Sequence, residues 1–167
     1  RCVRGRVDLG MAGRSAVEAK CQDAAVCDAM EALLVDRKVA AKFLPLVKEA
    51  YEKESVELRG DEEVGKIIAV KAATQEDWGS EYGDLILSIK IVDGMDEAIE
   101  HINTYGSGHT DAIVTEDEAT AHRFMALVDS ANVFWNCSTR FADGYRYGLG
   151  AEVGISTNKI HARGPVG

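Results

Sequence analysis

The sequence is short of basic residues and lacks any long hydrophobic run. Lysine and arginine number 19 against 28 aspartates and glutamates, which gives a net charge of −9 at pH 7. An acidic chain lacks the positive electrostatic potential that attracts the phosphate backbone of a nucleic acid, so we expect no nucleic-acid partner. No apolar run approaches the roughly 20 residues that span a bilayer, and no signal-peptide pattern opens the chain. We therefore expect a cytoplasmic protein with no membrane partner.

Cysteine and proline are also scarce. The four cysteines include no CxxC pair and no histidine spacing typical of zinc, so we expect reduced thiols and no metal site. With only two prolines and 28% charged residues, the composition argues against disorder. A length of 167 residues, 46% of them hydrophobic, is enough for one sizeable core.

Strand and helix patterns alternate in the second half of the chain. Residues 85–92 alternate with the period of a strand, 95–105 have helical spacing, and 111–115 form a second strand pattern. A helix pattern and a last strand at 131–135 follow. A helix between two strands carries the chain back so that the second strand runs in the same direction as the first. The alternation of strands and helices with short connections therefore predicts an α/β fold with a parallel sheet.

The first half is less regular. Apolar spacing predicts a helix over 28–35 and another over 43–54, followed by a strand at 56–60 and a loop over 61–84. Residues 1–14 carry four arginines and three glycines with neither helical nor strand period, so we expect them to be irregular.

Cys27 directly precedes the first of these predicted helices. A helix N-terminus lowers the pKa of a thiol from its usual value of about 8.5, whereas the carboxylate of Asp28 raises it. From these residues alone, a packing cysteine and a nucleophile are both open. Cys137 follows a predicted strand and is a second candidate, for which space-filling at the strand end is the alternative.

The charge balance reverses near the C-terminal end. Residues 138–163 hold four basic and two acidic side chains, so this stretch is a candidate anion site, with Arg140 and Arg163 among its cations. His101 and His122 fall on polar helix faces and are expected to be solvated.

Three stretches make the chain resemble a known family. "HTDAIVTEDEATA", "VFWNCSTRFADGYRYGLGAEVGIST" and "HARGPVG" are similar to the γ-glutamyl phosphate reductases, of the aldehyde dehydrogenase superfamily. The resemblance runs from about residue 16 to 167. It implies a parallel-sheet catalytic domain over 15–167, incomplete at its C-terminal end and without the cofactor-binding domain, while residues 1–14 do not follow the family pattern.

The resemblance implies roles for particular residues. "AVCDAMEALLV" is similar to the segment that carries the family's nucleophilic cysteine, which makes Cys27 the expected catalytic residue; the family usually has Asn where Asp28 stands. "EYGDLIL" resembles the superfamily's Glu-x-Phe-Gly-Pro segment, and Glu81 would bind the nicotinamide ribose, although the Phe and Pro are absent.

The substrate implied by the resemblance is L-γ-glutamyl 5-phosphate, which carries a phosphate and an α-carboxylate. Arg140 is the first expected ligand for these anions, and His161 with Arg163 is the second. The implied reaction reduces this substrate with NADPH to L-glutamate 5-semialdehyde and phosphate, in proline biosynthesis, through a cysteine thioester.

The wider context stays open at this stage. Family members occur alone or behind a glutamate kinase domain in bifunctional pyrroline-5-carboxylate synthase, and the superfamily implies a homo-oligomer. Because half of the NADPH site is absent, we expect the chain by itself to be inactive. The alternative is a truncated, non-catalytic piece with only a packing or association role.

Overall fold

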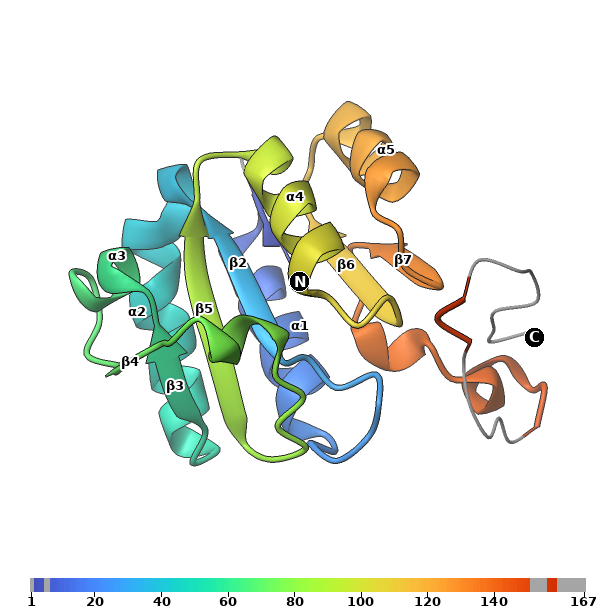
Figure 1. Cartoon of the computed structure of the whole chain (residues 1–167), viewed down its shortest axis with the longest axis horizontal. Coiled ribbons are helices and arrows are strands. Elements are labelled where there is room, and N and C mark those ends of the chain that lie inside the picture. Colours follow the sequence, from blue (N-terminus) through green and yellow to red (C-terminus); the bar gives the residue numbers. More distant parts are fainter. Residues whose placement is uncertain (1, 5–6, 151–155, 159–167) are drawn as a thin grey trace.

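The computed structural model describes residues 2–4, 7–150 and 156–158, which form a seven-stranded sheet with helices on both faces (Figure 1). All neighbouring strands are parallel, in the order β4-β3-β5-β2-β1-β6-β7. The strands are β1 (Cys2–Val3), β2 (Ala32–Asp36), β3 (Glu57–Gly60), β4 (Lys71–Ala72), β5 (Ile86–Val92), β6 (Thr110–Val114) and β7 (Asn132–Trp135). The predicted α/β fold with a parallel sheet is confirmed.

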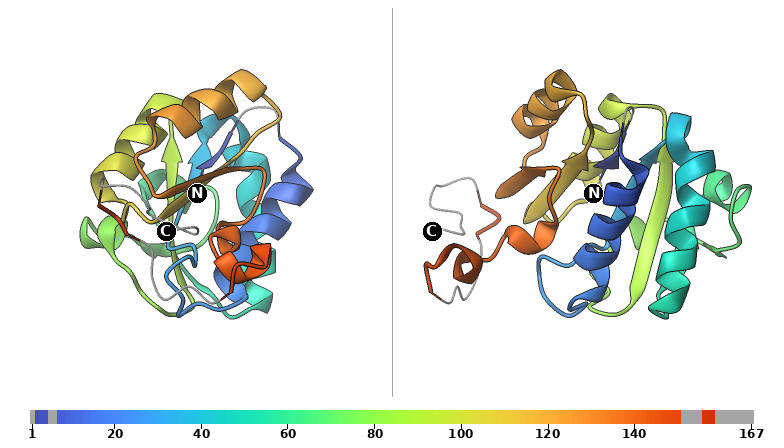
Figure 2. Two further views of the ribbon diagram at one scale, coloured as in Figure 1. Left: turned by 90° about the vertical axis from the view of Figure 1, so that its right-hand side faces the viewer. Right: turned by 180° about the vertical axis from the view of Figure 1, so that it is seen from behind.

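Helices bury one apolar layer on each face of the sheet. On one face lie α1 (Leu9–Cys21), α2 (Arg37–Lys53) and the short α3 (Glu62–Gly65), and on the other lie α4 (Met95–Tyr105) and α5 (Glu118–Leu127) (Figure 2). Single-turn 3₁₀ helices occupy Glu76–Gly79, Thr139–Phe141 and Gly144–Tyr147. No helix in the described ranges has the length and apolar content needed to cross a bilayer.

The elements predicted from a clear period are confirmed. Strands are present at 56–60, 85–92, 111–115 and 131–135 within a residue or two, and the helix over 95–105 begins and ends where predicted. The helix predicted over 43–54 begins earlier, at Arg37. The expected loop over 61–84 also contains α3, β4 and the first 3₁₀ helix, elements too short to show a period.

The helix predicted over 28–35 is wrong, because Ala32–Asp36 form the strand β2. This strand lies inside the sheet, between β1 and β5. Leu33 and Val35 are buried in one apolar layer and Leu34 in the other. A strand buried on both faces reads as a continuous apolar run, which a short window cannot distinguish from a helix.

Residues 1–14 are not irregular as expected, since they contain β1 and the start of α1. The carboxylate of Asp8 caps α1 by accepting a hydrogen bond of 2.9 Å from the backbone N–H of Met11. Gly10 and Gly13 lower the helix propensity of the segment. The apolar face of the helix consists of small residues, which give a weak periodic signal: Ala12, Ala16 and Ala19, all fully buried.

The central strand β1 has only two residues. Cys2 pairs with Leu34 on one side and Ile113 on the other, and Val3 likewise joins β2 and β6. Both side chains are fully buried. Burial raises the pKa of the Cys2 thiol to about 12, so this cysteine is a packing residue.

Candidate functional site

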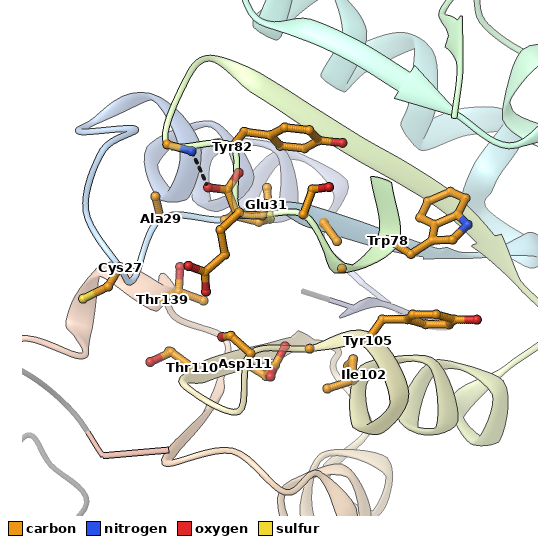
Figure 3. Close-up of a pocket in the computed structure, with 18 of the residues that line it drawn as sticks. Cys27, Ala29, Glu31, Trp78, Tyr82, Ile102, Tyr105, Thr110, Asp111 and Thr139 are labelled. Atoms are coloured by element: carbon orange, nitrogen blue, oxygen red, sulfur yellow. Dashed lines mark hydrogen bonds between the residues drawn. The ribbon is translucent and has the colours of Figure 1, made fainter. Parts of the chain in front are cut away.

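A cavity of about 480 Å³ lies at the amino-terminal ends of β2, β5 and β6 (Figure 3). Three loops line it, each leading into one of these strands, and Thr139 adds a fourth wall. The polar and aromatic lining residues include Cys27, Glu31, Trp78, Glu81, His101, Tyr105, Asp111 and Thr139. Open parallel sheets usually bind ligands at the carboxyl ends of their strands. This cavity lies at the opposite edge of the sheet, so the topology alone would not have located it.

Cys27 lies in the turn between α1 and β2, and the expected position at a helix N-terminus is wrong. Of the four cysteines, all within the described part of the chain, Cys27 alone lines the cavity; the second candidate, Cys137, does not. Partial burial raises the pKa of the Cys27 thiol, the carboxylate of Asp28 raises it further, and Arg140 acts in the opposite direction.

Asp28 is buried and paired with Arg140. The Asp28 carboxylate is 5% exposed and accepts a hydrogen bond from Nη1 of Arg140. Nε of Arg140 donates to Oε1 of Gln22 at 3.2 Å, and Nη2 of Arg146 donates to the same oxygen at 2.7 Å. The guanidinium of Arg140 is therefore bound to the residue that follows Cys27, near the proposed nucleophile. Two of its three nitrogens already donate hydrogen bonds to protein side chains.

The other two expected anion ligands, His161 and Arg163, lie outside the described residues. Among the residues described, the cavity lining contains three carboxylates and no lysine or arginine. No group of three or more histidines, cysteines or carboxylates is placed to hold a metal ion in that part of the chain.

Glu81 lines the same cavity as Cys27, on the loop that leads into β5. Its side chain is exposed and has no hydrogen bond or ion pair with another described residue. An unpaired carboxylate on a cavity wall can accept hydrogen bonds from a ligand with adjacent hydroxyl groups. The structure thus brings together two of the residues singled out in the sequence.

A buried carboxylate holds the loop that carries Glu81. Asp77 accepts hydrogen bonds from the backbone N–H and hydroxyl of Thr74, from Nη1 of Arg59 and from the hydroxyl of Tyr82. Burial alone would raise the pKa of Asp77, but the hydrogen bonds outweigh it and hold the pKa well below its usual range. This network fixes both ends of the segment between Thr74 and Tyr82.

A buried ion pair fixes the other side of that loop. Nζ of the fully buried Lys20 lies 2.6 Å from Oε2 of Glu31, and Oε1 of Glu31 accepts a hydrogen bond of 3.3 Å from the N–H of Gly83 (Figure 3). Glu31 therefore links α1 to the loop before β5. The sequence could not reveal this pair, because Lys20 and Glu31 come together only when α1 packs on the sheet.

An aromatic group forms the end of the cavity near α4. The ring of His101 lies edge-on to Trp78, with centroids 5.5 Å apart, and tilted against Tyr105 at 4.8 Å. The expectation that His101 is solvated is wrong: it is 7% exposed, and burial lowers its pKa to about 4, with Lys90 adding to the effect. The helix pattern could not reveal this, because Trp78 comes from a distant loop.

The chain is similar to known proteins in sequence. Residues 81–151 match the aldehyde dehydrogenase family. The chain is 64% identical over 160 residues to a curated γ-glutamyl phosphate reductase of Ruminiclostridium cellulolyticum, and 58% identical over 167 residues to the one of Methanosarcina barkeri. Each match covers 96% of this chain, and the chain spans 37% of the length of these relatives.

The solved structures give the same result. The crystal structure of γ-glutamyl phosphate reductase from Thermotoga maritima matches with a TM-score of 0.96 and 47% identity, over 99% of this chain and 40% of that one. The corresponding structure from Saccharomyces cerevisiae matches with a TM-score of 0.65 and 34% identity, over 89% of this chain and 38% of that one. Over almost its whole length the chain is therefore similar to the γ-glutamyl phosphate reductases, and residues 81–151 match the aldehyde dehydrogenase family.

Proposed function

We propose that this chain supplies the nucleophile-bearing part of an enzyme that reduces L-γ-glutamyl 5-phosphate to L-glutamate 5-semialdehyde and phosphate in proline biosynthesis. The observation that carries the proposal is the presence of Cys27 and Glu81 on one cavity. Relatives named γ-glutamyl phosphate reductase support the substrate class. The whole reaction belongs to a protein of the relatives' full length.

Cys27 is the proposed nucleophile. Its thiolate would attack the acyl carbon of the substrate, forming a C–S bond while the C–O bond to phosphate breaks and phosphate leaves with the electron pair. The product of this step is a thioester on Cys27. Since Asp28 is paired with Arg140, its carboxylate opposes the thiolate less than an unpaired carboxylate would.

The cavity fits the nicotinamide end of a cofactor. The unpaired carboxylate of Glu81 can accept hydrogen bonds from ribose hydroxyls, and the aromatic wall of Trp78 and Tyr105 can cover a planar ring. We propose NADPH as this cofactor, which when bound would supply the hydride that converts the thioester to the aldehyde. The protein residues would hold the ribose and keep water away from the thioester.

Arg140, His161 and Arg163 remain the proposed ligands for the substrate's anionic groups. In Arg140 only Nη2 has no partner among the described residues, so Arg140 would contribute through that nitrogen. Its main effect would be on the Cys27 loop, through Asp28.

A second candidate function, association with other protein surface, is favoured by one observation. Residues 136–150 extend away from the sheet (Figure 2). This segment exposes large apolar side chains. Those with exposed fractions of 51–73% are Tyr145, Tyr147 and Leu149. We propose a homo-oligomer on this basis, which light scattering of the purified chain would test. In the non-catalytic alternative, this association would be the chain's only role.

Thiol mapping separates the two candidates. The full chain is treated with limiting iodoacetamide, and the adducts are located by peptide mass spectrometry. We expect Cys27 to react first, followed by Cys21 and Cys137, with the buried Cys2 last. Modification that falls first on Cys137, or evenly on all four cysteines, would contradict a nucleophilic Cys27. NADPH oxidation with the acyl phosphate requires the relatives' full length, and we expect none from this chain alone.

A further inference from the structure

One wall of the cavity contains a buried hydroxyl group without a partner. Thr139 begins a 3₁₀ helix and is 3% exposed, and its Oγ1 has no hydrogen-bond partner among the described residues. Its neighbour Ser138 differs, because the Ser138 hydroxyl accepts the backbone N–H of Arg140. Burying an unpaired hydroxyl costs free energy, and native structures keep few such groups, so this one calls for an explanation.

Thr139 is close to Cys27. The two residues line the same cavity (Figure 3), and the residue after each, Arg140 and Asp28, are joined by the buried ion pair. The wall formed by Thr139 is therefore tied to the loop that carries the thiol.

Few buried hydroxyl groups in this cavity are free to donate a hydrogen bond. The hydroxyl of Tyr82 donates to Asp77, and that of Ser80 donates to a backbone carbonyl. The hydroxyls of Tyr105 and Ser107 only accept and each keeps a proton to donate, but Tyr105 belongs to the aromatic end of the cavity and Ser107 is exposed. Glu31, Glu81 and Asp111 add only acceptors when ionised. A ligand oxygen that enters the cavity would find the hydroxyl of Thr139 without a competing partner among the residues described.

We propose that Thr139 is a substrate-binding residue whose hydroxyl donates a hydrogen bond to the carbonyl oxygen of the acyl group that Cys27 captures. The inference rests on the proposed function, since it needs an acyl group at Cys27. A donor aimed at this oxygen stabilises the negative charge that develops there when the thiolate attacks. The same hydrogen bond satisfies the buried hydroxyl when substrate is present.

Two variants of the full chain test the proposal. Thr139→Val has nearly the same shape but lacks the hydroxyl, and Thr139→Ser keeps the hydroxyl and loses the methyl group. Acylation of Cys27 is followed by intact-protein mass spectrometry with acetyl phosphate, a small acyl phosphate, as the probe. We expect Thr139→Val to slow acylation about 100-fold, the usual effect of removing one such donor, and Thr139→Ser to retain most of the rate.

Alkylation by iodoacetamide is the control. The thiolate attacks the CH₂ carbon of this reagent, which carries no oxygen, so no oxyanion forms that Thr139 could stabilise. The rate should be the same in all three proteins. If Thr139→Val acylates at the rate of the unchanged chain, the inference is wrong while the role of Cys27 stands. If the unchanged chain is not acylated at Cys27, the proposed function fails and this inference fails with it.

Unfolding by urea gives a second readout that needs no substrate. Because no described residue bonds to the hydroxyl of Thr139, Thr139→Val should unfold at the same urea concentration as the unchanged chain or at a higher one. A lower midpoint for Thr139→Val, restored in Thr139→Ser, would mean that the hydroxyl bonds within the protein. That outcome would overturn the proposal, whatever the acylation rates.

Discussion

The guanidinium of Arg140 is bound to the buried carboxylate of Asp28, the residue after Cys27, although 112 positions separate the pair in the sequence. The negative charge beside the thiol is thus accompanied by a counter-charge, and the two act on Cys27 in opposite directions.

Replacing Asp28 should make Cys27 more acidic. Asp28→Asn removes a charge that raises the pKa of the thiol and leaves the positive charge of Arg140 beside it. We expect the rate of Cys27 alkylation by iodoacetamide, measured over a pH series, to reach half its maximum at a lower pH than in the unchanged chain. Cys21 serves as the internal control and should keep its profile; coinciding Cys27 profiles would show that Asp28 has no influence.

Removing Arg140 should cost stability. Arg140→Met leaves a carboxylate that is only 5% exposed without its counter-charge, for which a loss of roughly 3–5 kcal/mol in the free energy of unfolding is typical. Arg123→Met is the matched control, since Arg123 pairs with the exposed Asp96 and such surface pairs contribute about 0–1 kcal/mol. Urea unfolding that gives equal losses for both variants would contradict the structural role of the buried pair.

The Lys20–Glu31 pair should respond unequally to its two single substitutions. Glu31→Gln leaves the fully buried ammonium group of Lys20 without a counter-charge, so we expect a loss of roughly 3–5 kcal/mol. Lys20→Met should cost less, because the Glu31 side chain is 21% exposed and also bonds to Gly83.

The double variant Lys20→Met with Glu31→Gln completes this comparison. It should be more stable than Glu31→Gln alone, because the charge left unpaired by the single change is gone. Urea unfolding of the four proteins measures the coupling between the two residues. Losses that simply add would mean that the two side chains do not interact.

His101 should make the fold sensitive to mild acid. Burial lowers its pKa from 6.5 to about 4 in the folded chain, so below pH 6.5 the unfolded chain binds a proton that the folded chain does not. Stability should therefore fall as the pH drops from 6.5 toward 4, by up to about 3 kcal/mol from this group.

Two variants isolate this contribution. His101→Phe keeps an aromatic ring against Trp78 and cannot titrate, so it should flatten the pH dependence of the urea midpoint in this range. His122→Gln removes an exposed histidine and should leave the dependence as it is. An unchanged slope in His101→Phe would mean that another group is responsible.

How much could be predicted from the sequence depended on the range of the interactions involved. β5 and α4 are defined by their own period, and the pattern alone located them. The strand β2 could not be separated from a helix, because its neighbours on both faces come from other parts of the chain. The small alanine face of α1 gave too weak a signal.

The site divides in the same way. Cys27 and Glu81 are predicted as site residues from short stretches that resemble the family's motifs; both line the cavity, and their roles stay predictions. The partner of Arg140, the burial of His101 and the hydroxyl of Thr139 could not be inferred from local sequence. Each depends on a contact between distant segments, and no local pattern encodes such a contact.

The two-residue strand β1 has a consequence for the order in which the chain can fold. It is the sole connection within the sheet between β4-β3-β5-β2 on one side and β6-β7 on the other, among the strands described. Cys2 and Val3 are synthesised before Ile113 and Val114, with which they complete their pairing. Until those residues are made, the larger half of the sheet has an unpaired apolar edge, so the nascent chain needs protection from edge-to-edge association while the last strands are synthesised.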